Sequence, residues 1–84
     1  MPYRYRLEVI DQLWHHGVHP TADTPPQLVY DFVNDLYRYE LRRLRARLVR
    51  GEIPKQGYYD RVVALRRKYP LVSFKAHLWV EGGA

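Results

Sequence analysis

Three of the four histidines in this chain fall in one short stretch, WHHGVHP, and they are the first residues to examine for chemistry. His15 and His19 lie four residues apart, which is the spacing of two zinc ligands on one helix face. Gly17 stands between them, however, and a glycine at this point is typical of a helix end, so His19 falls on the following loop. An imidazolium at a helix C-terminus is stabilised by the helix dipole. We therefore interpret His15 and His16 as helix-terminal residues and predict no metal or other cofactor.

Carboxylates are the second group with catalytic potential. Asp31 and Asp35 are one helical turn apart and would be placed to divide acid and base roles, but arginines within helical reach of Asp35 would hold it ionised. Glu40 falls close to the apolar side of the same predicted helix, where an unpaired carboxylate is costly. The sequence predicts a structural ion pair between Glu40 and Arg61, with Arg6 or a tyrosine hydroxyl as alternative partners.

The remaining signatures of catalysis are missing from the sequence. There is no Ser-His-Asp order, no glycine-rich phosphate loop and no dinucleotide-binding fingerprint. The chain has no cysteine, so neither a disulfide nor a thiolate metal site is available. We predict that the protein is not an enzyme.

The most basic stretch, RYELRRLRARLVRG at residues 38–51, contains six arginines. They straddle two flanks of a helix, whereas a helix that reads DNA presents one face to the groove. We interpret this stretch as a solvated or partner-facing surface. Nucleic-acid binding is the main alternative, and binding to a membrane surface is a further one. The candidate surface for a partner or a nucleic acid consists of Arg38, Tyr39, Arg42, Arg43, Arg45 and Arg50.

Composition narrows the classes of partner. The formal net charge of +5 and the pI of about 9.7 favour an acidic protein, a nucleic acid or an anionic membrane surface. No apolar run reaches the length of a transmembrane segment, and the first residues, MPYRYRLEVIDQ, are too charged for a signal peptide. We expect a cytoplasmic protein.

Helical periodicity predicts the elements that position these side chains. A single domain over residues 1–84 is expected, with helices at approximately 3–16, 25–50 and 54–69. Gly17 and Gly51 mark two of the helix ends. Thr24 is predicted to cap the second helix, with Pro25 at its first position and Gln27 completing a capping box.

The fold class predicted from this pattern is all-α. It is a three-helix domain built on an antiparallel αα-hairpin, because a short link at Gly51 joins two long helices. The apolar tail at residues 71–80 is expected to pack on the hairpin as a helical turn or an extended strip.

The first half of the second helix is apolar around much of its circumference, which predicts a homodimer. The candidate dimer surface is Leu28, Val29, Phe32, Val33 and Leu36.

Several aromatic residues do not match the helical stripes. Tyr5, Tyr39 and Tyr59 fall away from them, as does Trp79. Exposed aromatic side chains beside arginines suit either a protein interface or the stacking of nucleic-acid bases. The sequence alone does not separate these two interpretations.

The hairpin itself has a recognisable order of leucines, a Gly-x-Ile link at Gly51 and Ile53, an aromatic residue at Tyr58, and further aliphatic residues. This order resembles the short C-terminal helix-loop-helix (SHOCT) domains over residues 41–66. The sequence departs from that family in having PKQG after the isoleucine, where a polar cap and an acidic residue are usual. The resemblance implies a small interaction or oligomerisation module without catalysis. Such a module is the function we expect, with a small basic nucleic-acid-binding protein as the alternative.

Overall fold

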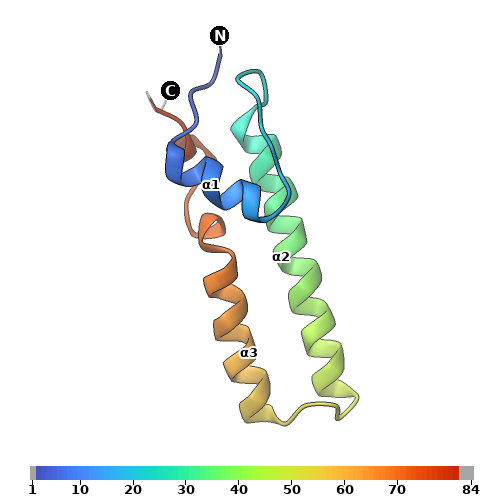
Figure 1. Cartoon of the computed structure of the whole chain (residues 1–84). Coiled ribbons are helices and arrows are strands. Elements are labelled where there is room, and N and C mark those ends of the chain that lie inside the picture. Colours follow the sequence, from blue (N-terminus) through green and yellow to red (C-terminus); the bar gives the residue numbers. More distant parts are fainter. Residues whose placement is uncertain (1, 82–84) are drawn as a thin grey trace.

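A computed structural model describes residues 2–81, and over this range the protein is all-α, as predicted (Figure 1). These residues form three α-helices: α1 (Leu7–His15), α2 (Pro26–Val49) and α3 (Lys55–Lys68). They continue into 3-10 turns at Pro70–Ser73 and Ala76–Trp79. Helices α2 and α3 lie side by side in opposite directions and form the expected hairpin. α1 lies across the end of this hairpin at which the chain begins and ends.

The predicted helix ends at glycine are confirmed. Gly17 and Gly51 have positive φ angles of 75° and 77°, which a glycine adopts without the steric cost of a Cβ atom. After α1, the N–H of Val18 donates to the carbonyl of Leu13 at 2.9 Å, and the same 6→1 bond follows α2. Both helices therefore end in a Schellman motif, which satisfies backbone carbonyls that the helix leaves free.

The predicted capping box at the start of α2 is not formed. The helix begins at Pro26, and the N-cap is Pro25, whose backbone is extended at φ −61° and ψ 131°. A residue before proline is disfavoured in the α region, so Pro25 cannot be the first helical residue. The Thr24 hydroxyl instead accepts a hydrogen bond from the loop backbone, and Gln27 donates to Asp31 at 2.9 Å.

The predicted first helix starts too early. α1 begins at Leu7, because the residues before it are extended and pair with the C-terminal tail. Tyr5 and Val80 form an isolated antiparallel bridge. The N–H of Arg6 donates to the carbonyl of Trp79 at 3.0 Å. Hydrogen bonds to a segment more than seventy residues away thus replace those that a longer helix would have made.

We refer to residues 2–37 and 69–81 together as the head, and to residues 38–68 as the distal hairpin. The head contains the main hydrophobic core, in which the tail packs on α1 and α2. Tyr5 and Trp79, which were expected to be exposed, are 8% and 1% exposed. The Tyr5 hydroxyl donates to the carbonyl of Thr24 at 2.6 Å, and the Trp79 indole donates to that of Phe74 at 3.2 Å. The core cluster comprises Tyr5, Val9, Leu13, Val29, Val33, Tyr69, Leu71, Trp79 and Val80.

The distal hairpin is built differently, because it has only two helices and no third layer (Figure 1). No side chain of α3 is fully buried, and Leu41, Leu44 and Leu48 of α2 are half-buried. The described residues therefore form a rod of 50 × 19 × 16 Å.

The charge is also distributed unequally between the head and the distal hairpin. Eleven of the fourteen lysines and arginines but only three of the nine acidic residues belong to the distal hairpin, which makes it strongly basic and the head acidic.

Candidate interaction surfaces on the helical hairpin

The first candidate surface is an apolar stripe on the outer side of α2. Leu28, Phe32 and Tyr39 are 63%, 53% and 55% exposed. Their spacing places them within about 40° of one another around the helix axis, so they share one face. Large apolar side chains gathered on one exposed face commonly mark an interaction site.

This stripe includes only part of the predicted dimer surface. Leu28 and Phe32 are exposed as expected, but Val29 and Val33 are buried in the core of the same chain, at 5% and 0% exposure. Leu36 is half-buried and packs against that core. The sequence prediction was therefore wrong for the two valines, because α1 and the C-terminal tail cover that side of α2.

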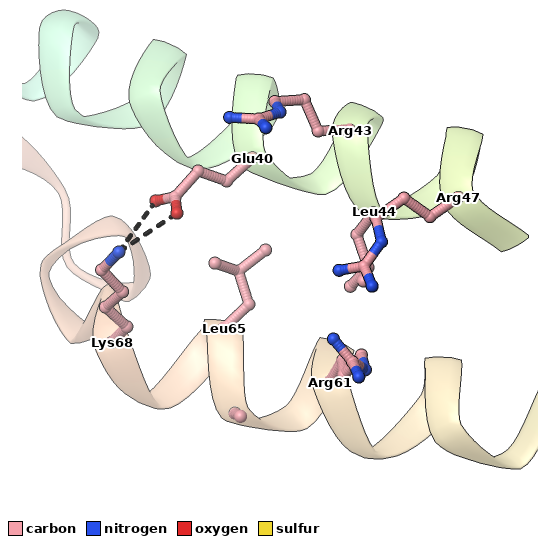
Figure 2. A pocket seen from close by; sticks show the side chains of 8 residues that line it. Glu40, Arg43, Leu44, Arg47, Arg61, Leu65 and Lys68 are labelled. Carbon is pink, nitrogen blue, oxygen red and sulfur yellow. Dashed lines mark hydrogen bonds and ion pairs between the residues drawn. The ribbon is translucent and has the colours of Figure 1, made fainter. Parts of the chain in front are cut away.

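The second candidate surface is a groove of about 320 Å³ between α2 and α3 (Figure 2). Leu44 and Leu65 project into the space between the helices. Four cationic side chains surround this apolar floor, two from each helix. The groove is lined by Glu40, Arg43, Leu44 and Arg47 of α2 and by Arg61, Ala64, Leu65 and Lys68 of α3.

Glu40 closes the groove at the end nearest the head. Its carboxylate accepts a hydrogen bond from the Nζ of Lys68 at 3.1 Å and another from the hydroxyl of Tyr69. The predicted partner, Arg61, lines the same groove but makes no ion pair with Glu40, whereas the alternative of a tyrosine hydroxyl is confirmed. Partial burial raises the pKa of Glu40, but the hydrogen bonds from Tyr69 and Lys68 outweigh this effect and hold it below 4.5.

His16, the C-cap residue of α1, extends this network to the end of that helix. Its ring stacks on that of Tyr69, with centroids 4.4 Å apart and planes 4° apart. Burial, followed by the nearby Lys68 ammonium, lowers the pKa of His16 below its usual 6.5. The Nε2 atom of His16 is buried without a hydrogen-bond partner among the described residues. The burial of Tyr69 and its hydrogen bond to Glu40 raise the pKa of Tyr69, so the phenol stays protonated as a donor.

The other histidines do not assemble a metal site in the part of the chain that the structure describes. The Nδ1 of His15 lies 2.7 Å from the carbonyl oxygen of Asp11, one turn earlier in α1. His19 lies on the loop after Gly17 and stacks on Trp14, with ring centroids 3.8 Å apart. No group of three or more possible metal ligands occurs within residues 2–81.

The predicted arginine surface does not form a single face. Arg38, Arg42 and Arg45 are exposed on the flank of α2 turned away from the groove. Arg43 lines the groove and lies 5.9 Å from the ring centroid of the exposed Tyr39. Arg50 pairs with Glu52 at the end of the hairpin.

Sequence reasoning missed the groove because its cations come from two helices. Arg47 and Lys68 are ordinary surface residues on their own helices, and only the packing of the hairpin brings them to one site. The antiparallel alignment of the two helices was the available signal. It places residues 40–47 of α2 beside residues 61–68 of α3.

Comparisons with protein-family models, with characterised proteins and with solved structures find no match to this chain. The resemblance of residues 41–66 to the short C-terminal helix-loop-helix domains therefore stays a prediction. Among the described residues, no helix is both long and apolar enough to cross a membrane.

Proposed function

We propose that the protein is a cytoplasmic, non-enzymatic interaction module that self-associates as a homodimer through the outer face of α2. The observation that carries this proposal is the apolar stripe of Leu28, Phe32 and Tyr39. These side chains stay more than half exposed on the longest helix of the molecule. Covering apolar surface of this size is a favourable contribution to association.

The construction of the distal hairpin supports the broader class, an interaction module, through a side of α2 other than the outer face. The two helices of the distal hairpin leave their leucines half-exposed, since a two-helix layer cannot enclose them. A further helix packed on such a layer would bury more apolar surface. Glu40, the only acidic side chain among the described residues that line the groove, is paired with Lys68, which is an arrangement more typical of a structural ion pair than of a catalytic carboxylate.

Light scattering coupled to gel filtration tests the proposal. The wild-type chain of 10.1 kDa should elute at twice this mass at micromolar concentration. Phe32→Glu should shift the protein toward the monomer, because it places a charge in the apolar stripe. Tyr59→Glu is the matched control, since Tyr59 is 69% exposed on α3, outside the stripe. A wild-type monomer at high micromolar concentration would refute the homodimer.

The second candidate function is nucleic-acid binding, and the basic distal hairpin favours it. Arg43, Arg47, Arg61 and Lys68 converge on one groove, and together they give this end of the rod a positive potential. Contacts of this kind to phosphates do not require a helix or strand that reads the bases.

Salt dependence distinguishes this second candidate. If the basic surface binds phosphates, affinity for a duplex or a single strand should fall steeply as salt rises, because counterions are released. Charge reversal at Arg42, Arg43 or Arg45 should then weaken binding more than reversal at Arg4 in the head. Weak binding that does not depend on which arginine is changed would exclude the nucleic-acid function.

A further inference from the structure

The exposed side of α2 carries a charge pattern with inverse symmetry. Asp31 and Asp35 precede Tyr39 at intervals of four residues, and Arg43 and Arg47 follow it at the same interval. In an α-helix, residues four apart form one continuous ridge along the surface. Because α2 is unbroken from Pro26 to Val49, the five residues form a single ridge about 24 Å long, at 1.5 Å per residue.

This ridge is complementary to itself when the helix is reversed. If two copies of α2 cross in opposite directions with Tyr39 at the centre, Asp35 of each copy faces Arg43 of the other. Asp31 of each is level with Arg47 of the other, but the ridge turns by about 160° around the helix between these two positions, and Arg47 lines the groove with α3. Ridges of residues four apart are also those that interdigitate in the commonest class of helix crossing. The charged side chains on either side of Tyr39 thus meet ones of opposite sign.

The apolar stripe accompanies the same ridge. Phe32 lies beside Asp31 and Asp35 on the helix surface and falls opposite Ala46 of the reversed copy, a small residue that leaves room for a ring. Asp31, Asp35, Tyr39 and Arg43 are all exposed, and the Arg47 side chain is 41% exposed. The ridge is therefore open to a second molecule from Asp31 to Arg43, whereas Arg47 lines the groove between α2 and α3 and lies 3.7 Å from Glu52 of the same chain.

The overall charge distribution selects the antiparallel arrangement. In a parallel pair, two strongly basic distal hairpins would lie side by side and repel each other. In an antiparallel pair, each basic distal hairpin lies beside the acidic head of the other copy, where six of the nine acidic residues occur. Complementary potentials of this kind fix orientation more than they add affinity.

We infer that α2 is the dimerisation helix of an antiparallel, two-fold symmetric homodimer. Its register is set by Asp35–Arg43 contacts around a central Tyr39–Tyr39 contact between the two copies. This inference rests on the proposed self-association and adds its surface, its orientation and its register. The two-fold axis makes each Asp35–Arg43 contact occur twice in every dimer, whereas the Tyr39–Tyr39 contact lies on the axis and occurs once.

A charge-swap series tests the register by sedimentation at low salt. Asp35→Arg and Arg43→Asp should each raise the dissociation constant about tenfold, since two symmetry-related ion pairs become repulsive. The double variant D35R/R43D should return it to near the wild-type value, because the pairs form again with their charges exchanged. Asp23→Arg and Arg45→Asp are matched controls that carry the same charge changes outside the ridge, and they should leave the dissociation constant within about twofold.

A cross-link tests the centre of the interface independently. The chain contains no cysteine, so Tyr39→Cys introduces a single thiol that can pair only with its own copy. Mild oxidation should convert this variant to a disulfide-linked dimer, because the two thiols face each other at the axis. Tyr59→Cys, on α3 and away from the ridge, should cross-link far more slowly.

The outcomes separate the inference from the proposed function. A dimeric wild type with rescue in D35R/R43D and rapid cross-linking at position 39 supports both. A dimeric wild type in which the double variant is no tighter than the single variants overturns the register and leaves the dimer standing. Cross-linking that is faster at position 59 than at position 39 also overturns it. A monomeric wild type refutes the proposed function itself.

Discussion

The head and the distal hairpin show two ways in which one chain stabilises helices. In the head, Trp79 and Leu13 are almost fully enclosed, and the tail, α1 and α2 all contribute to one core. In the distal hairpin, α3 has no fully buried side chain, although it is as regular a helix as α1. Helical structure is thus continuous along the rod, whereas tertiary packing is concentrated at one end. The difference shows that α2 is anchored by the head and that its far half is available for other contacts.

The joint between the two regions is polar. Glu40 of the distal hairpin accepts hydrogen bonds from Lys68 and Tyr69, and Tyr69 is itself stacked on His16, the C-cap residue of α1. This arrangement links α1, α2 and the end of α3 at the point where the apolar core ends. Stability of the head and alignment of the hairpin therefore depend on each other.

The largest effect is expected from Trp79→Ala, which would disrupt the closed core that distinguishes the head from the distal hairpin. A large cavity in the head core should cost about 3–5 kcal/mol of the free energy of unfolding. For a domain of this size that is a substantial share of the total stability. Chemical denaturation followed by circular dichroism measures the loss. A loss below about 1 kcal/mol would show that the head is not the main source of stability.

Tyr69→Phe should have an intermediate effect, because it removes one hydrogen bond at the joint and keeps the ring. The expected cost is about 1.5–3 kcal/mol, since the lost bond is made to a carboxylate. Tyr30→Phe is the matched control, because its hydroxyl makes only a longer bond, of 3.4 Å, to the carbonyl of Val72. Equal losses for the two variants would argue against a special role for the Glu40 contact.

A smaller effect is expected from Leu48→Ala in the distal hairpin. Because Leu48 is only half-buried, truncation should cost roughly 1 kcal/mol, well below the cost in a closed core. Leu13→Ala, at a site with 0% exposure, provides the comparison within the head. If both truncations cost the same, the distal hairpin must be covered in solution by a surface other than the α2 ridge.

The smallest effect should come from the titration of His16. Burial and the nearby Lys68 and His15 lower its pKa in the folded chain, while Glu40 acts in the opposite direction. The unfolded chain therefore binds a proton first, and stability should fall as pH decreases through 6.5. His16→Phe keeps an aromatic ring against Tyr69 and should flatten stability between about pH 7 and 5.5. The contribution of Glu40 to stability is lost only as pH falls below 4.5. The effects of His16 and Glu40 on stability therefore occur in different pH ranges.

Much of the local structure was predictable from the sequence, and the reasons are local. Gly17 and Gly51 end their helices because positive φ is accessible to glycine. The long apolar periodicity of α2 and the short link after it predicted the hairpin. α2 starts one residue later than predicted, because Pro26 holds Pro25 out of the α region.

The candidate surfaces were less predictable, because they depend on which side of each helix is covered. The arginines of α2 were identified from the sequence, but Arg47, Arg61 and Lys68 became one groove only through the packing of α3. Phe32 and Val33 are neighbours in the sequence and equally apolar in character. Phe32 is 53% exposed, whereas Val33 is fully buried. Which of the two is covered depends on the side of α2 on which α1 and the C-terminal tail pack.

The sequence by itself determined the periodicity of the helices, the positions at which they end and the order of charges along α2. Those features follow from bonds and side chains within a few residues of one another. The tertiary structure alone decided that Tyr5 pairs with Val80, that Trp79 fills the core and that Glu40 binds Lys68 and Tyr69. These contacts join residues far apart in the chain, and their free energy depends on shapes that exist only after the helices have packed.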